Sequence, residues 1–167
     1  MLIGIFADTH DHLDNIRKSV AVFNAHQCDL ILFAGDFVST FVLPPMRKLN
    51  APMIACFGDN EGNKTGLYGG MTIIGKLGEP PFGFKTECGK KILLTHQLWL
   101  IKDYGEAEII VYAHTHKAKI HTDDAGRLFI NPGEASGWSN GKPSVALLDT
   151  ETMQAEHLWL DDVELPV

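Results

Sequence analysis

The chain has 167 residues, of which 45% are hydrophobic and 21% are charged, and its formal net charge is −7. This size and composition predict one domain over residues 1–167, with a substantial core. No apolar run approaches the ~18–20 residues of a membrane span, and the negative charge disfavours non-specific nucleic-acid binding through a basic surface.

The N-terminus and the cysteines point to a cytoplasmic protein. The first residues lack a basic region and a cleavage site of small residues, so they predict a core strand rather than a signal peptide. Cys28, Cys56 and Cys88 are an odd number and widely spaced, without a Cys-x-x-Cys pair. This usage is typical of reduced thiols in the cytoplasm.

The first 60 residues predict alternating strands and helices. Strand-length apolar runs each end in an acidic residue: residues 2–7 before Asp8, 30–34 before Gly35-Asp36, and 52–57 before Gly58-Asp59. Between the first two runs, an apolar helical face extends to about His26, with Asp14 as the expected N-cap. Residues 44–49 predict a second, short helix. This order favours a parallel βαβαβ arrangement.

The rest of the chain predicts mainly antiparallel strands. Residues 61–81 are rich in glycine and proline, and a helical face there is weakened by the glycines. Turn residues between apolar runs predict three hairpins: 82–87 with 91–95, 117–122 with 128–130, and 144–149 with 154–159. Residues 97–106 predict a short helix or a loop, and residues 109–113 predict another strand.

Side chains that suit divalent metals follow five of these strands. They are Asp8, His10, Asp36, Asp59 (or Asn60), His96, His114 and His116. Singly, Asp36 could cap a turn and His96 could be an ordinary polar residue, so the joint pattern carries the prediction. Oxygen and imidazole ligands suit divalent transition metals. One catalytic zinc takes about three protein ligands. Seven candidates therefore predict two metals, which can hold a hydroxide between them and clamp a phosphoryl oxygen.

The order and context of these motifs resemble the calcineurin-like metallophosphoesterases. The motifs are Asp8-x-His10, Gly35-Asp36, Gly58-Asp59-Asn60, His96 and His114-Thr115-His116. The small YfcE-type phosphodiesterases of bacteria and archaea, and the retromer subunit of the same fold, are similar over nearly the whole chain. The resemblance implies an α/β fold in which a two-sheet β-sandwich is flanked by helices.

The same resemblance implies a ligand set and a reaction. Asp8, His10 and His116 would hold one metal, His96, His114 and Asp59 the other, and Asp36 would bridge the two. The reaction would be hydrolysis of a phosphodiester by in-line attack of a hydroxide that bridges two divalent ions. Manganese is the expected ion, and nickel, zinc, iron and cobalt also fit. The expected partner is a small phosphodiester or nucleotide substrate, with no membrane partner.

The chain departs from the family pattern at three places. Asp59 stands where an Asn ligand is usual, unless the loop shifts and Asn60 takes that role. Asn60 occupies the position of the histidine that protonates the leaving group in many relatives, and an amide cannot be a general acid. His12, near the first motif, is a weak candidate to replace this histidine as the general acid. Only 17 residues separate His96 from His114, so the helix between them is expected to be trimmed.

A second interpretation is a metal-binding scaffold for protein interaction, with little or no catalysis. It predicts an exposed apolar patch and a stable partner. The full ligand set favours the enzyme, because a scaffold does not need it. The sequence leaves open the substrate, the native metal, the oligomeric state, and whether Trp138, on a loop, packs or stacks on substrate.

Overall fold

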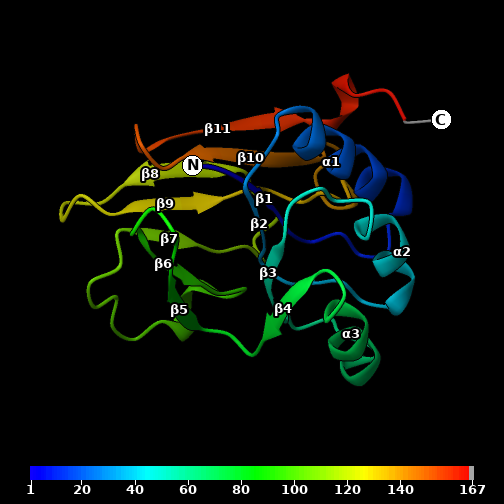
Figure 1. Cartoon of the computed structure of the whole chain (residues 1–167), viewed down its shortest axis with the longest axis horizontal. Coiled ribbons are helices and arrows are strands. Elements are labelled where there is room, and N and C mark those ends of the chain that lie inside the picture. Colours follow the sequence, from blue (N-terminus) through cyan, green and yellow to red (C-terminus); the bar gives the residue numbers. More distant parts are fainter. Residues whose placement is uncertain (166–167) are drawn as a thin grey trace.

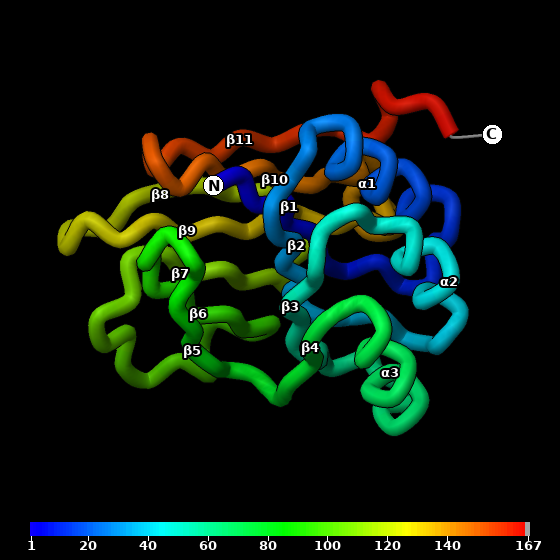
Figure 2. The backbone as a smooth tube through the Cα atoms, in the orientation of Figure 1, coloured from blue at the N-terminus to red at the C-terminus, as the bar shows by residue number. Residues whose placement is uncertain are grey.

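The computed structural model describes residues 1–165, which form two β-sheets packed face to face (Figure 1). The first sheet contains six strands: β1 (Leu2–Phe6), β2 (Leu30–Phe33), β3 (Met53–Cys56), β4 (Gly75–Gly78), β10 (Ser144–Asp149) and β11 (Gln154–Trp159). Their order is β11-β10-β1-β2-β3-β4. The strands β1 to β4 are parallel, as predicted for the first three, and β10 pairs with β1 in the antiparallel sense (Figure 2).

The second sheet contains five strands: β5 (Phe82–Lys85), β6 (Lys91–Leu94), β7 (Ile109–Val111), β8 (Lys119–Thr122) and β9 (Leu128–Asn131). Their order is β5-β6-β7-β9-β8. The three predicted hairpins are confirmed, but the prediction of an antiparallel run was wrong for β6, β7 and β9, which are mutually parallel. The hairpin partners β5 and β8 lie at the two edges of the sheet. In the interior, β6, β7 and β9 therefore pair with one another, and these pairs are parallel.

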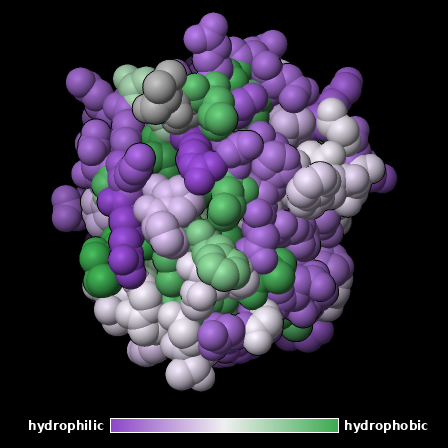
Figure 3. Space-filling view, turned by 90° about the vertical axis from the view of Figure 1, so that its right-hand side faces the viewer, coloured by the Kyte–Doolittle hydropathy of each residue, from purple (hydrophilic) through white to green (hydrophobic). Residues whose placement is uncertain are grey.

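Three α-helices cover the outer face of the six-stranded sheet: α1 (Leu13–Ala25), α2 (Leu43–Met46) and α3 (Lys64–Met71) (Figure 1). The apolar face of α1 packs Ile16 and Phe23 against Phe6 and Phe33 of the sheet. On the surface, this side is a mosaic of hydrophilic and apolar residues (Figure 3). None of the helices within residues 1–165 is long and apolar enough to cross a membrane.

Two details of the helices differ from the prediction. The N-cap of α1 is His12, whose side chain accepts a hydrogen bond from the Asn15 amide, whereas Asp14 lies inside the helix and pairs with Arg17. The second helix is shorter than residues 44–49 and follows a 3-10 turn at Thr40–Val42.

Residues 61–81, which predicted no clear element, contain α3 and β4. The strand was missed because its first and last residues are glycines, which disfavour strands by propensity. In the sheet, a Cβ at Gly75 would lie 1.8 Å from the Met53 carbonyl oxygen. Close approach of β4 to β3 therefore requires glycine at this position.

The core has two layers and a smaller third cluster. Between the sheets, Ile3 and Ile5 of β1 face Ile92 and Val111 of the other sheet. The outer face of the five-stranded sheet is covered by the segment after His96, whose only regular element is a 3-10 turn at Leu98–Leu100. The expected trimming of this helix is thus confirmed.

Candidate metal centre

The carboxyl ends of five strands bring the predicted ligands to one end of the sandwich. Asp8 and His10 follow β1, Asp36 follows β2 and Asp59 follows β3. His96 follows β6, and His114 and His116 follow β7. Parallel strands of an α/β sheet commonly present ligand-binding side chains at their carboxyl ends. The structure brings these side chains together as two adjoining groups.

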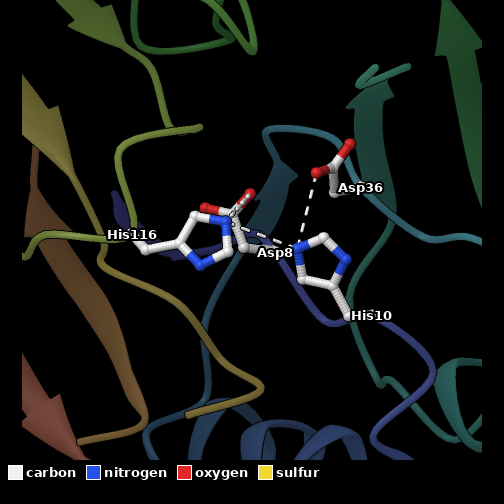
Figure 4. A group of neighbouring side chains, drawn as sticks. All are labelled: Asp8, His10, Asp36 and His116. Carbon is white, nitrogen blue, oxygen red and sulfur yellow. Dashed lines mark hydrogen bonds and ion pairs between the residues drawn. The ribbon is translucent and has the colours of Figure 1, made fainter. Parts of the chain in front are cut away.

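The first group consists of Asp8, His10, Asp36 and His116, whose potential ligand atoms all lie within 4.8 Å of one another. The imidazoles of His10 and His116 point toward each other, with 3.4 Å between their Nε2 atoms (Figure 4). His10 Nε2 also lies 3.4 Å from Asp36 Oδ2, and His116 Nε2 lies 3.8 Å from Asp8 Oδ1. The four side chains therefore converge on one point.

The second group consists of Asp59, His96 and His114. Asp59 Oδ1 lies 2.8 Å from His96 Nε2 and 3.0 Å from His114 Nδ1. Asp36 lies between the two groups, because its Oδ1 is 3.5 Å from His96 Nε2 while its Oδ2 faces His10. This is the position that a bridging carboxylate needs.

Asn60 does not face these imidazoles. Its backbone amide donates to Asp36 Oδ1 at 2.9 Å, and its Nδ2 donates to Asp36 Oδ2 at 2.8 Å. Of the two alternatives for the family's Asn ligand, the geometry therefore places Asp59 with His96 and His114. Asn60 instead orients the carboxylate of Asp36.

Asp8 provides a test of whether a cation fits. Its side chain is fully buried, and neither carboxylate oxygen has a hydrogen-bond partner among residues 1–165. Burial, and then the neighbouring Asp36, raises the pKa of Asp8 well above its usual value. A buried carboxylate without a partner is costly. A divalent cation would remove this cost, and the oxygen and imidazole donors suit a transition metal.

Two glutamates that the sequence analysis missed hold the ligands in place. Buried Glu134 accepts a hydrogen bond of 2.9 Å from His116 Nδ1, which leaves Nε2 directed at the centre. Burial opposes ionisation of Glu134, but hydrogen bonds from the Ser139 amide and from His116 hold its pKa below the usual value. Carboxylate partners of this kind fix the tautomer and orientation of metal-binding histidines.

Glu61 organises the loops that carry two of the carboxylates. It accepts hydrogen bonds from the backbone amides of Asp36 and Val38, each at 3.0 Å, and of Gly58 at 2.8 Å. His96 is held by the backbone instead, with 2.7 Å from Nδ1 to the Ala34 carbonyl oxygen. The available signal for Glu61 was its place directly after the third motif, and for Glu134 it was an isolated acid among small residues.

The backbone at the ligands is in the left-handed region. Positive φ values occur at five candidate ligands: Asp8 (51°), His10 (40°), Asp36 (65°), His114 (67°) and His116 (60°). Such conformations are costly for residues other than glycine and concentrate at functional sites. They turn the chain sharply after β1, β2 and β7, which directs these side chains toward the common point.

Of two cavities in the described structure, one adjoins the candidate ligands and the other lies far from them. A cavity of about 190 Å³ lies beside the second group and is lined by Asp59, His96, Phe57 and Pro80, among others. A larger cavity of about 630 Å³ lies at the opposite ends of β2, β3 and β4. The smaller cavity is the relevant one, because it adjoins the candidate ligands.

Comparison with known proteins finds relatives over nearly the whole chain. Residues 1–153 match the calcineurin-like phosphoesterase superfamily domain. The chain is 35% identical over 168 residues to phosphodiesterase MJ0936 of Methanocaldococcus jannaschii, covering 96% of this chain and 100% of that protein.

Solved structures show the same fold. A structure described as a novel archaeal phosphodiesterase superposes with a TM-score of 0.88 at 33% identity, covering 95% of this chain and 99% of that one. The phosphoesterase YfcE of E. coli superposes with a TM-score of 0.70 at 17% identity, covering 96% and 100%. A variant of Vps29 from Entamoeba histolytica superposes with a TM-score of 0.66 at 18% identity, covering 95% and 99%.

Proposed function

Because the chain belongs to the calcineurin-like phosphoesterase superfamily, we propose that this phosphoesterase acts on small phosphodiesters with two divalent cations. The choice of diesters is supported by the phosphodiesterase that is 35% identical along nearly the whole chain. The observation that carries the dinuclear proposal is the position of Asp36, whose two oxygens face His10 and His96 of different groups.

The contacts favour one division of the ligands. Asp8, His10 and His116 would hold the first cation, and Asp59, His96 and His114 the second, with Asp36 shared. When bound, the cations would lower the pKa of a coordinated water for in-line attack and neutralise charge on the phosphoryl group. Manganese is the ion we propose, and nickel, zinc, iron and cobalt suit the same donors.

The chain's own residues set the charge of this centre. Asp8, Asp36 and Asp59 contribute −3 against +4 from two divalent cations, and a bound hydroxide would bring the total to 0. An Asn in place of Asp59 would leave +1. We therefore propose tighter metal binding and a weaker attraction for an anionic substrate than a centre with an Asn ligand would have.

Proton delivery to the leaving group limits the substrates. Asn60, which stands where many relatives have a histidine, donates hydrogen bonds to Asp36 from its backbone amide and from its Nδ2. His12 uses its Nδ1 to accept a hydrogen bond from the Asn15 amide and caps α1. Aryl diesters, whose leaving groups need no proton, should therefore react faster than alkyl monoesters.

A metal titration with a chromogenic diester tests the proposal. We expect elemental analysis to find two manganese ions per chain, and the loaded protein to hydrolyse bis(p-nitrophenyl) phosphate. Asp36→Asn should lower both the manganese content and the rate of hydrolysis. Asp124→Asn, a change at an exposed turn residue, should lower neither quantity. Two bound ions without turnover, in manganese and in nickel, would overturn the enzyme and favour the metal-binding scaffold.

A further inference from the structure

Trp138 is an exposed aromatic side chain beside the first group of ligands. Its side chain is 66% exposed, and its indole Nε1 donates to the backbone carbonyl oxygen of His10 at 3.4 Å. Its ring packs against His12, with 4.7 Å between centroids and 36° between the ring planes. An aromatic surface thus lies in contact with the segment that carries a candidate ligand.

The position of this ring is fixed from several directions. The loop that carries it is joined to α1 by a hydrogen bond of 3.1 Å from Asn15 Nδ2 to the Ser136 carbonyl oxygen. On the other side of Trp138, Asn140 Nδ2 donates to the His116 carbonyl oxygen at 2.8 Å. Glu134, which holds His116, also accepts from the Ser139 and Asn140 amides. The loop and the ligands are therefore parts of one hydrogen-bonded unit.

A rigid, exposed tryptophan is well suited to bind a planar ring. An aromatic side chain offers a large apolar face for stacking, and a preorganised ring loses little entropy when a ligand stacks on it. Because His12 packs against Trp138, part of the indole is occupied by protein, and its exposed part is available to a ligand.

We propose that Trp138 is a stacking platform for an aromatic ring, of the nucleobase class, on one ester arm of the substrate. This inference rests on the proposed function, because it takes the phosphoryl group to lie at the metal centre. Trp138 is therefore a specificity-determining residue: it contacts a remote part of the substrate and takes no part in the reaction. Its contribution should appear in ground-state binding, as in other remote contacts.

Binding measurements can separate this platform from the hydrolytic step. Isothermal titration calorimetry of the manganese-loaded protein would give Kd for thymidine monophosphate and for methyl phosphate, which share the phosphate but not the ring. We expect the parent to bind the nucleotide about 10-fold more tightly, a typical effect of stacking one base. Trp138→Ala should remove most of this preference and leave Kd for methyl phosphate unchanged.

Three further variants separate stacking on Trp138 from a loss of packing. Trp138→Phe should keep the preference, and Trp138→Leu, which still packs against His12, should lose it. Trp159→Ala removes another exposed tryptophan, which packs near His157 rather than at a candidate ligand, and should bind both compounds like the parent. Should Trp138→Ala lose manganese, the Phe and Leu variants decide the question.

Two results would overturn the platform. One is a parent that binds both phosphates equally; the other is a set of Trp138 variants that weaken both to the same extent, which would assign Trp138 to support of His10. Turnover of bis(p-nitrophenyl) phosphate is measured in the same samples. A nucleotide preference without any turnover would contradict the proposed function and leave the platform standing.

Discussion

Asp59 gives the candidate metal centre its third carboxylate. Burial opposes ionisation of this side chain, but the imidazoles of His96 and His114 outweigh it and hold its pKa below the usual value. Asp59 is therefore ionised at neutral pH and ready to bind a cation. The neighbouring Asn60 is engaged with Asp36, so the two residues have different tasks.

Replacing this carboxylate tests which of the two residues binds metal. We expect Asp59→Asn to lower manganese affinity at least about 10-fold, since even outer partners of metal ligands contribute about 10–100-fold. Turnover should not rise. A manganese titration measures the change, and a variant that binds manganese as well as the parent would assign the ligand role to Asn60.

Glu134 should matter for metal binding although it faces away from the centre. In Glu134→Gln the side chain keeps its size but loses the charge that stabilises and orients His116. We expect manganese affinity to fall about 10–100-fold. The titration should be paired with a thermal melt of the metal-free protein. Unchanged affinity would mean that Glu134 only holds the loop.

The cysteines offer a residue-scale prediction away from the centre. Hydrogen bonds with Thr150 and Thr86 lower the pKa of exposed Cys88, whereas burial raises the pKa of Cys28 to about 11. Near pH 8, iodoacetamide should therefore modify Cys88 first, because the thiolate is the reactive form. Mass spectrometry over time measures the order, and Thr150→Val should shift the Cys88 rate profile to higher pH.

At the scale of elements, the turns after the strands shape the centre more than the strands do. The strands place the candidate ligands at one end of the sandwich. The left-handed residues and two glycines in the turns orient the side chains toward the centre. A Cβ on Gly58 would lie 2.0 Å from Asp36 Oδ1, and one on Gly35 would lie 2.8 Å from His96 Nδ1. Both glycines therefore permit close approach between loops of neighbouring strands.

A single methyl group tests this packing. Gly58→Ala should displace Asp36 and abolish tight binding of the second manganese ion. Gly69→Ala is the matched control, because a Cβ there meets nothing within 4 Å, and alanine should stabilise α3 by roughly 0.5–1 kcal/mol. Metal titration and thermal melts measure both variants. A Gly58→Ala protein with normal metal binding would contradict the steric argument.

For the whole molecule, the buried charges of the metal-free centre act against folding. The pKa of Asp8 is raised in the folded state, chiefly by burial, so the folded protein holds this proton more tightly than the unfolded chain does. The stability from this linkage is fully present below the unfolded carboxyl pKa of about 3.9 and is lost as pH rises through the folded value. A bound cation should restore the stability that the protein loses when Asp8 ionises at neutral pH.

Asp8→Asn tests this linkage by removing the buried charge. In the metal-free state at pH 7 we expect the variant to melt a few degrees above the parent, since about 1 kcal/mol corresponds to roughly 2–4 °C at this size. The difference should shrink as pH falls toward 4. Manganese should raise the Tm of the parent far more than that of the variant. A variant that melts lower at pH 7 without metal would contradict the account.

The sequence by itself determined those elements of the fold and those candidate ligands that depend on a local sequence pattern. Apolar runs of strand length predicted β1, β2, β3 and the hairpins, since alternation and turn residues act within a few positions. The acids and histidines after those runs predicted the centre, because parallel strands end at one edge. The trimmed helix after His96 was predicted from the 17 residues before His114, compared with the pattern of the family that the chain resembles.

Only the tertiary structure decided the contacts between distant segments. The glycines of β4 disfavour a strand by propensity, and its close approach to β3 explains why they are there. Asp59 and Asn60 are adjacent in sequence, yet one faces His96 and the other Asp36. Glu134 contacts His116 and Trp138 contacts the backbone of His10, residues more than ten positions away in the sequence, and such partners leave no periodic signal in the chain. Burial and hydrogen bonding, which no local pattern specifies, settle these choices.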